Sequence, residues 1–239
     1  MFWFIFLFIS CQMFYYSDEN TQEFEVTQVS SGYNIGVTKA IDTSLKVHSF
    51  NSEMGHGHGS GNLFHIGKHL FVITASHVID DAVNILVEET NGNMLAARTV
   101  YINKHSDIAI LLPYGEFTKT KSTSYVVNRE HDLLAKKLHY YGYPDSLKGF
   151  LAIGFVSQSN HIELMMQSYA WMGCSGSIVF DSAGRAVGVV HAILIQAEPV
   201  SGMPTAIESV VVVNRLYDLE RKIIRERLVD AKTKDRNAD

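Results

Sequence analysis

Short segments rich in β-branched and aromatic residues recur along most of the chain, and this pattern constrains the fold more than any other feature. Residues that favour turns separate the segments, notably at 91–93 and 181–184. Regularly spaced short strands with turn signals between them are typical of an antiparallel barrel or sandwich. We therefore expect an all-β fold, with strands over residues 63–66, 69–75, 83–88, 96–102, 107–112, 138–143, 150–157, 162–166, 177–180, 186–195 and 209–213.

Two segments depart from the strand pattern. Residues 55–61 contain four glycines and are expected to form a loop, because glycine weakens helix and strand alike. Near the end of the chain, apolar residues at helical spacing predict a helix that begins at a cap on Asn214 and runs to about residue 228. The charged residues that follow, 229–239, are expected to fray as a tail.

Composition places the chain among ordinary globular proteins. Its 239 residues are 46% hydrophobic and 19% charged, enough for one large all-β unit or two small barrels with a real core. The formal net charge of -5 argues against a nucleic-acid partner. With only two cysteines, Cys11 and Cys174, a structural disulfide is not expected, so packing must hold the fold together.

Residues 1–16 form an apolar leader, and residues 17–54 form a lead-in to the folded part of the chain. The leader fits a secretion signal or a membrane anchor, although no basic residue precedes it. Ile9-Ser10-Cys11 also resembles a lipoprotein cleavage box, and a buried strand is a further alternative. The first three alternatives predict a secreted, periplasmic or membrane-associated protein.

Three polar residues stand in the order His77, Asp107, Ser175, which is one of the known chain orders of a Ser-His-Asp triad. His77 follows an apolar run, and Asp107 opens another, where a carboxylate is costly to bury unless it is paired. Ser175 lies between Gly173 and Gly176, which permit a tight turn that exposes the hydroxyl. That turn also allows the N–H groups of Gly173 and Ser175 to converge as an oxyanion hole.

Each of the three residues also has an ordinary structural explanation. A histidine after a strand can be a satisfied core residue, an aspartate before a strand often caps a turn, and a serine between glycines can simply form a turn. Asp80 and Asp81 remain alternatives for the carboxylate.

Longer stretches add a family resemblance to these three residues. They read GSGNLFHIGKHLFVITASHVI, HSDIAILLP, HYYGYP with GFLAIGFVSQ, WMGCSGSIVFDSAGRAVGVVHA, and TAIESVVVVNRL. Over about residues 55–228 the chain resembles the chymotrypsin-fold (trypsin-like) serine peptidases. It is most similar to their disulfide-free branch of high-temperature-requirement-type and viral processing proteases, and the spacing of the three polar residues fits that branch.

The resemblance implies a double six-stranded antiparallel β-barrel with a C-terminal α-helix, the barrels meeting near residues 115–135. It implies that His77 is general base and acid, that Asp107 orients it and that Ser175 attacks, with the N–H groups of Gly173 and Ser175 as the oxyanion hole. The implied activity is that of a serine endopeptidase working through an acyl-enzyme on polypeptide substrates, without a cofactor or metal. The sequence does not indicate an oligomeric state.

The resemblance also suggests a substrate pocket formed by Tyr169, His191 and Ala192. No acidic residue stands there, so we expect a neutral pocket for a small apolar, aromatic or glutamine side chain. Two residues depart from the family pattern, Cys174 before the nucleophile and Ser177 where a second glycine is common. They leave an inactive protease-fold binding module and a nucleophilic Cys174 as alternatives. An esterase-type hydrolase that uses the same triad is a further alternative.

His56, His58, His65 and His69 raise the possibility of a metal site. Their spacing matches no catalytic zinc helix, and the glycines among them disfavour a helix. We therefore expect ordinary polar histidines here.

Overall fold

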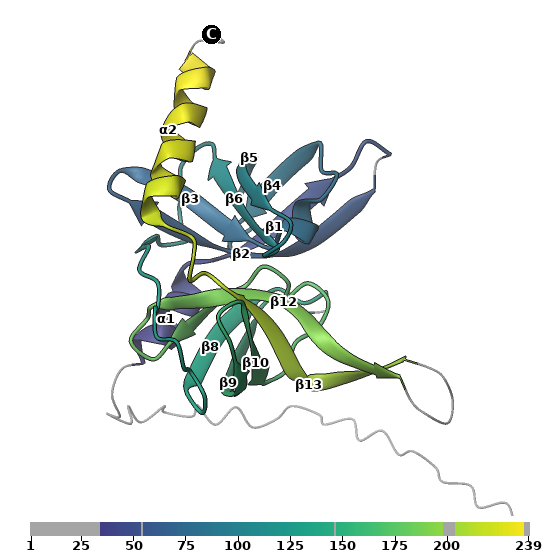
Figure 1. Cartoon of the computed structure of the whole chain (residues 1–239). Coiled ribbons are helices and arrows are strands. Elements are labelled where there is room, and N and C mark those ends of the chain that lie inside the picture. The colour runs from purple at the N-terminus through teal and green to yellow at the C-terminus, as the bar shows by residue number, and fades with distance from the viewer. Residues whose placement is uncertain (1–33, 54, 146, 198–203, 237–239) are drawn as a thin grey trace, which may run out of the picture. The chain divides into compact units, whose positions relative to one another are not determined.

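The computed structural model describes residues 34–53, 55–145, 147–197 and 204–236, and within them two β-barrels follow one another along the chain (Figure 1). In the first barrel the strands are ordered β1-β4-β5-β6-β3-β2, and β2 pairs back with β1 to close the ring. Its strands are β1 (Ser44–Phe50), β2 (His56–Ile66), β3 (His69–Thr74), β4 (Asn84–Glu88), β5 (Met94–Asn103) and β6 (Ile108–Pro113). The short β7 (Thr123–Ser124) adds a parallel pairing to β2.

The second barrel is closed in the order β10-β13-β12-β11-β8-β9. Its strands are β8 (Lys137–Gly142), β9 (Phe150–Ser159), β10 (Glu163–Gln167), β11 (Ile178–Asp181), β12 (Ala186–Ala197) and β13 (Pro204–Arg215). Both rings are antiparallel, so the predicted double six-stranded barrel is confirmed.

Each barrel encloses its own apolar core. In the first, Phe64 packs against Phe71 and meets Tyr125 edge to face, and all three side chains are fully buried. The second core is built around Leu138 and Tyr140 with apolar residues of the neighbouring strands. Such burial stabilises a fold by roughly 25 cal/mol per Å² of apolar surface, and within the described residues no disulfide contributes, since Cys174 is a free thiol.

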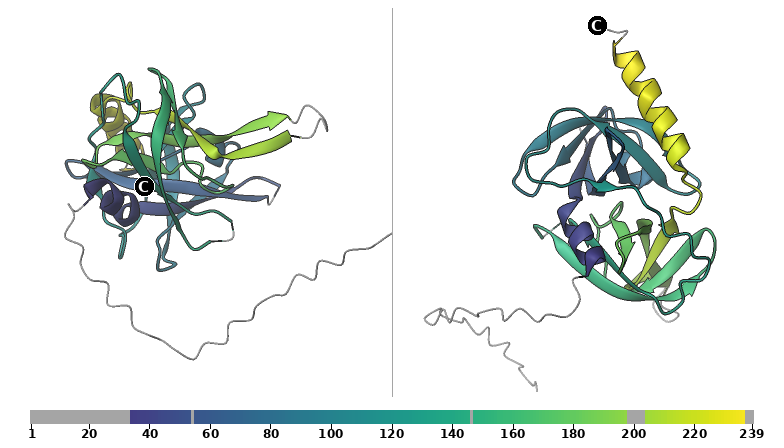
Figure 2. Two further views of the ribbon diagram at one scale, coloured as in Figure 1. Left: turned by 90° about the horizontal axis from the view of Figure 1, so that it is seen from below. Right: turned by 90° about the vertical axis from the view of Figure 1, so that its left-hand side faces the viewer.

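Two helices flank the barrels. Helix α1 (Ile35–Asp42) begins at Asn34, whose side chain accepts hydrogen bonds from the Gly36 and Val37 amides, and α1 packs on β8 and β11 of the second barrel. Helix α2 (Arg221–Arg236) packs on β5 and β3 of the first barrel, and the right-hand view of Figure 2 shows it running along that barrel. Among the described residues no helix combines the length and apolarity needed to cross a membrane. The leader, residues 1–16, and residues 17–33 of the predicted lead-in lie outside the described residues.

Two sequence expectations fail near the first barrel. Residues 17–54 were expected as a lead-in to the folded part of the chain, whereas residues 35–42 and 44–50 form α1 and β1. The glycine-rich segment 55–61 was expected as a loop, whereas from His56 onward it belongs to β2 and pairs with β1. Here glycine serves close packing, because a Cβ on Gly59 would lie 2.5 Å from a Val78 methyl and 2.8 Å from the Ser175 carbonyl oxygen.

The predicted start of the terminal helix lies too far towards the N-terminus. Asn214 and Arg215 still belong to β13, and the buried Arg215 guanidinium donates to the backbone carbonyls of Glu130, His131 and Asn160. The helix starts at Arg221 and continues to Arg236, beyond the expected end. Its last turns are held to the first barrel, because Arg98 on β5 donates to the Ala231 carbonyl and pairs with Asp235.

Candidate active site

Strand pairing places His77 next to Asp107. Strand β3 pairs with β6, with Thr74 opposite Ala109. His77 lies in the 3₁₀ turn η1 (Ser76–Ile79) after β3, and Asp107 immediately precedes β6. Two residues that are distant in sequence therefore meet at one end of a strand pair.

The Asp107 side chain is buried and fully occupied by hydrogen-bond donors. Its Oδ1 accepts from the Ser76 hydroxyl at 2.7 Å and from the His77 amide at 2.9 Å. Its Oδ2 lies 2.7 Å from His77 Nδ1. The backbone at Asp107 has a φ of 50°, a left-handed conformation that aspartate tolerates better than most residues.

These contacts fix the charge of Asp107. Burial raises the pKa of the carboxyl group, but hydrogen bonds from His77, Ser76 and His191 outweigh it and hold the pKa well below its usual range. A carboxylate can only accept hydrogen bonds. The shared hydrogen therefore lies on His77 Nδ1, and in the neutral ring Nε2 keeps a lone pair that can accept a proton.

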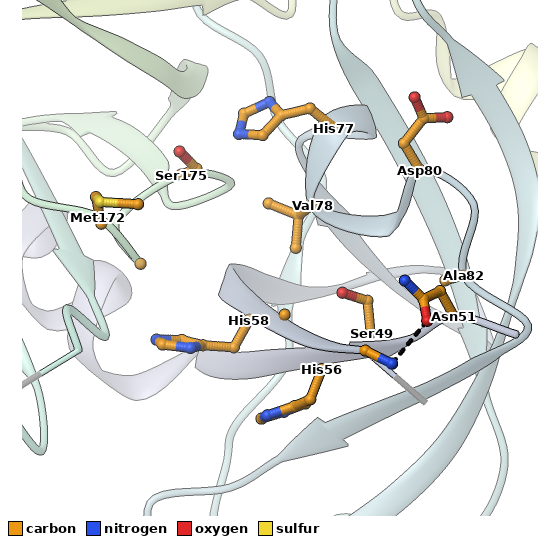
Figure 3. Close-up of a pocket in the computed structure, with 13 residues that line it drawn as sticks. Ser49, Asn51, His56, His58, His77, Val78, Asp80, Ala82, Met172 and Ser175 are labelled. Carbon is orange, nitrogen blue, oxygen red and sulfur yellow. Dashed lines mark hydrogen bonds between the residues drawn. The ribbon is translucent and has the colours of Figure 1, made fainter. Parts of the chain in front are cut away.

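Ser175 lies in the turn between β10 and β11, and it lines the same cavity as His77. Figure 3 shows the two side chains on facing sides of that cavity. Gly173 and Gly176 flank it with φ values of 96° and 91°, a region in which other residues are strained. A Cβ on Gly176 would also lie 2.1 Å from the Ser60 carbonyl oxygen. Glycine is thus required on both sides of the hydroxyl.

The amides of this turn divide into two groups. Those of Cys174, Gly176 and Ser177 donate to backbone carbonyls. No described residue accepts a hydrogen bond from the amides of Gly173 or Ser175, which are the two that the sequence assigns to the oxyanion hole. They are available for a ligand.

Ser60 is a site residue that the sequence analysis missed. From β2 its amide donates to the Ser175 carbonyl oxygen at 2.7 Å, and its hydroxyl donates to the Gly173 carbonyl oxygen at 2.7 Å. The same hydroxyl accepts from the Tyr143 amide at 2.9 Å. Ser60 therefore ties the nucleophile turn of the second barrel to a strand of the first.

The cavity beside Ser175 has a volume of about 470 Å³. It extends from Ser175 and His77 to His56 and His58, and its lining is completed by Ser49, Asn51, Gly55, Gly57, Val78, Asp80, Ala82, Met172 and Gly173. His58 lies 3.1 Å from a carboxylate oxygen of Asp145. Burial first and the charge of Lys46 second lower the pKa of His58.

Two of the predicted pocket residues lie away from this cavity. Tyr169 is exposed and stacks on Trp171 in the segment before the nucleophile. Ala192 is partly buried on β12 opposite Val212. Neither residue lines the cavity that holds His77 and Ser175. Tyr169 and Ala192 therefore belong to a different region from this cavity.

The third predicted pocket residue, His191, is directed at the candidate triad. Its Nδ1 lies 2.5 Å from Oδ2 of Asp107, the same oxygen that His77 contacts. The two imidazole rings meet edge to face with centroids 5.8 Å apart. Asp107 thus receives hydrogen bonds from two histidines.

The two departures from the family pattern are buried. The Cys174 side chain is in the second core, and burial raises the pKa of its thiol, which makes it a poor nucleophile. Ser177 is fully buried and its hydroxyl has no hydrogen-bond partner among the described residues. Its φ is not positive, so a side chain at this position does not strain the turn.

The other carboxylates near His77 have different surroundings. Asp80 forms a salt bridge with Lys104 at 2.6 Å and lies on the rim of the cavity. Asp81 is exposed and has a φ of 58°. It is Asp107 that contacts the His77 ring.

The four histidines considered as metal ligands do not form one cluster. His56 contacts His48, His58 contacts Asp145, and His65 lies between the hydroxyls of Ser122 and Ser124, while His69 stands at the start of β3. In the described ranges the grouping with metal-ligand spacing is instead His77, Asp107 and His191.

The two barrels and their order of strands define the chymotrypsin fold. Residues 59–189 match the family described as the trypsin-like peptidase domain. Because this match spans more than half of the chain, the protein belongs to that family.

One solved structure with the same fold is the serine endoprotease from Yersinia pestis, with a TM-score of 0.63 and 21% sequence identity. The likeness covers 85% of this chain and 69% of that one, and at this identity it concerns the fold. No curated protein matches the sequence.

Proposed function

We propose that the protein is a serine endopeptidase whose triad is His77, Asp107 and Ser175. The observation that carries the proposal is the 2.7 Å contact between Asp107 Oδ2 and His77 Nδ1, with Ser175 facing His77 across a shared cavity. Membership of the trypsin-like peptidase family supports peptide bonds as the substrate class.

The reaction follows from the protonation states at the site. Ser175 Oγ attacks the peptide carbonyl while His77 Nε2 takes its proton, and Asp107 stabilises the imidazolium that forms. His77 then gives this proton to the amine of the leaving peptide, and an acyl-enzyme remains on Ser175. Water, activated by His77 in the same way, releases the acid and restores the hydroxyl.

The negative charge of the tetrahedral intermediate needs donors that are not otherwise engaged. The N–H groups of Gly173 and Ser175 meet this requirement among the described residues. Each such donor typically lowers a barrier by roughly 3 kcal/mol. Ser60 supports this role indirectly, because its hydroxyl holds the Gly173 carbonyl oxygen.

We further propose that the segment with Tyr169 and Trp171 and the cavity with His56 and His58 bind the substrate on opposite sides of the cleaved bond. Tyr169 and Trp171 present stacked aromatic faces and, by the family resemblance, would contact the side chain before the cleaved bond. The cavity lined by His56 and His58 would hold residues of the leaving peptide. The aromatic faces of Tyr169 and Trp171 predict a preference for apolar, aromatic or glutamine side chains before the cleaved bond. A cleavage profile from a peptide library that is dominated by Arg and Lys would contradict it.

The test is cleavage of denatured casein by the full chain beside Ser175→Ala and His77→Ala. Ser157→Ala and His65→Ala are matched controls, since Ser157 is exposed on β9 and the ring nitrogens of His65 hydrogen-bond to serine hydroxyls outside the cavity. We expect the first pair to lose at least about a thousandfold in rate and the controls to keep it. A folded but inactive wild type would support a binding module, and turnover of short-chain esters without casein cleavage would support an esterase.

A further inference from the structure

Asp107 Oδ2 is shared by two imidazoles. It lies 2.7 Å from His77 Nδ1 and 2.5 Å from His191 Nδ1. The three ligand atoms all lie within 4.8 Å of one another. A triad needs only one histidine on its aspartate, so the second imidazole calls for an explanation of its own.

The remaining contacts of Asp107 favour a ligand role for this oxygen. Oδ1 is held by the Ser76 hydroxyl and the His77 amide, so the carboxylate is fixed with Oδ2 toward the histidines. Hydrogen bonds of this kind orient the ligands of metal sites and typically contribute about 10–100-fold to affinity.

The donor set is that of a borderline transition metal. Two imidazole nitrogens and one carboxylate oxygen are ligands of Zn²⁺, which binds nitrogen and oxygen at about 2.0–2.2 Å. A tetrahedral site at such distances needs ligand atoms about 3.4 Å apart, so Oδ2 and the two nitrogens must separate by less than an ångström. The histidine side chains are 46% and 40% exposed, which leaves them free to move and leaves a fourth position open to water.

We propose that His77, Asp107 and His191 form a binding site for Zn²⁺ or a similar transition metal, and that occupation of this site reversibly inhibits the protein. The binding is independent of the activity, whereas the inhibition rests on the function proposed above.

The inhibition follows from the tautomer of His77. In the free protein Nδ1 carries the hydrogen and Nε2 accepts a proton from Ser175. A metal takes the lone pair of Nδ1, so the Nδ1 proton passes to solvent and Nε2 gains one, with no net change in charge on the ring. Nε2 then donates and cannot accept, and Ser175 loses its base.

The cluster of His48, His56 and Glu88 is the competing location. His48 lies 3.0 Å from His56 and 2.7 Å from a carboxylate oxygen of Glu88, so both of its ring nitrogens are already engaged. Among the described residues the grouping with metal-ligand spacing is the one at Asp107 and not this cluster. His56 therefore provides the matched control for His191.

Binding is measured on the full chain carrying Ser175→Ala, which keeps all three ligands but does not turn over. After metal removal, Zn²⁺ is titrated by calorimetry, and Co²⁺ reports a four-coordinate site by its visible absorption. We expect one ion per chain, an affinity at least about tenfold weaker with His191→Gln, and no change with His56→Gln.

His77→Gln is a second ligand variant, chosen because that side chain is nearly half exposed and tolerates replacement if His191→Gln fails to fold. Affinity unchanged in both ligand variants, or lost in His56→Gln, would overturn the site. In the wild type, inhibition of casein cleavage by Zn²⁺ and its reversal by a chelator support the switch. Tight binding without inhibition would overturn the switch alone.

Discussion

The amide of Ser60 donates a hydrogen bond to the carbonyl oxygen of Ser175 at 2.7 Å. Ser60 lies on β2 of the first barrel, and Ser175 lies in the turn before β11 of the second. The geometry of the candidate nucleophile therefore depends on contact between the barrels, as well as on its own glycine-rich turn. The flanking Gly59 allows this approach, because any side chain there would meet the Ser175 carbonyl oxygen.

Replacing Ser60 by alanine keeps this amide bond and removes only the hydroxyl. The Gly173 carbonyl and the Tyr143 amide then lose their shared partner, and the oxyanion turn is held less firmly. We expect kcat for peptide cleavage to fall about tenfold or more with a smaller change in KM, and the free energy of unfolding to fall by about 1–2 kcal/mol. Steady-state kinetics and urea unfolding measure both, and an unchanged kcat would refute the positioning role.

Ser177→Ala tests the opposite situation, a buried hydroxyl without a partner among the described residues. An unsatisfied buried hydroxyl costs roughly 1–3 kcal/mol, so its removal should leave stability unchanged or raise it by about 1 kcal/mol. The side chain does not face the cavity, and activity should be retained. Thermal unfolding is the measurement. A clear loss of stability would show that the hydroxyl has a hydrogen bond.

Asp107→Asn addresses the orientation of His77. The amide nitrogen cannot accept the hydrogen bond from Nδ1 in the way a carboxylate does, so the ring loses the tautomer it needs. We expect kcat/KM to fall by roughly 10³–10⁴-fold with the fold retained. Circular dichroism checks the fold and peptide cleavage gives the rate. A rate within tenfold of the wild type would exclude Asp107 as the orienting carboxylate.

Glu89 gives a prediction about pH. Its buried carboxylate accepts hydrogen bonds from the Asn93 side chain and from the amides of Thr118, Lys119 and Thr120. Burial raises the pKa of Glu89, but these hydrogen bonds lower it from 4.5 to about 2. A carboxyl group whose pKa is lowered in the folded state stabilises the fold at pH values above its ordinary pKa. This stabilisation is lost as the pH falls through the folded pKa.

Glu89→Gln should therefore lower the unfolding free energy by about 2 kcal/mol at pH 7. The difference from the wild type should shrink as the pH falls from 4.5 towards 2. Urea unfolding across that range tests it, with the exposed Glu116→Gln as the control. A difference that stays constant with pH would show that the charge of Glu89 does not contribute.

Most strands could be predicted from the sequence, because strands that are buried in a barrel contain alternating or continuous apolar residues between turn signals. The prediction failed where glycine serves packing. In residues 55–61 the glycines alternate with other residues at the period of a strand, and this period was the available signal for β2. The predicted start of the terminal helix was wrong because Leu216 and Leu219, which lie in a turn before α2, are buried and have the spacing of helical residues.

The candidate site was predictable to the extent that short motifs carry its chemistry. His77, Asp107 and Ser175 stand in recognisable contexts, and the structure places the first two in contact. The role of His191 in a substrate pocket stays a prediction. Its contact with Asp107 was not expected, because the direction of a side chain on β12 depends on the register of the whole barrel. Ser60 was missed because its partners come from the other barrel.

The most direct test of the triad is labelling of the full chain with a fluorophosphonate probe, followed by mass spectrometry to locate the adduct. The probe reacts with a serine hydroxyl that a neighbouring base activates. We predict a single adduct on Ser175 that disappears in Ser175→Ala and in His77→Ala. An adduct on another residue, labelling that persists in His77→Ala, or no adduct on the folded wild type would contradict an activated Ser175.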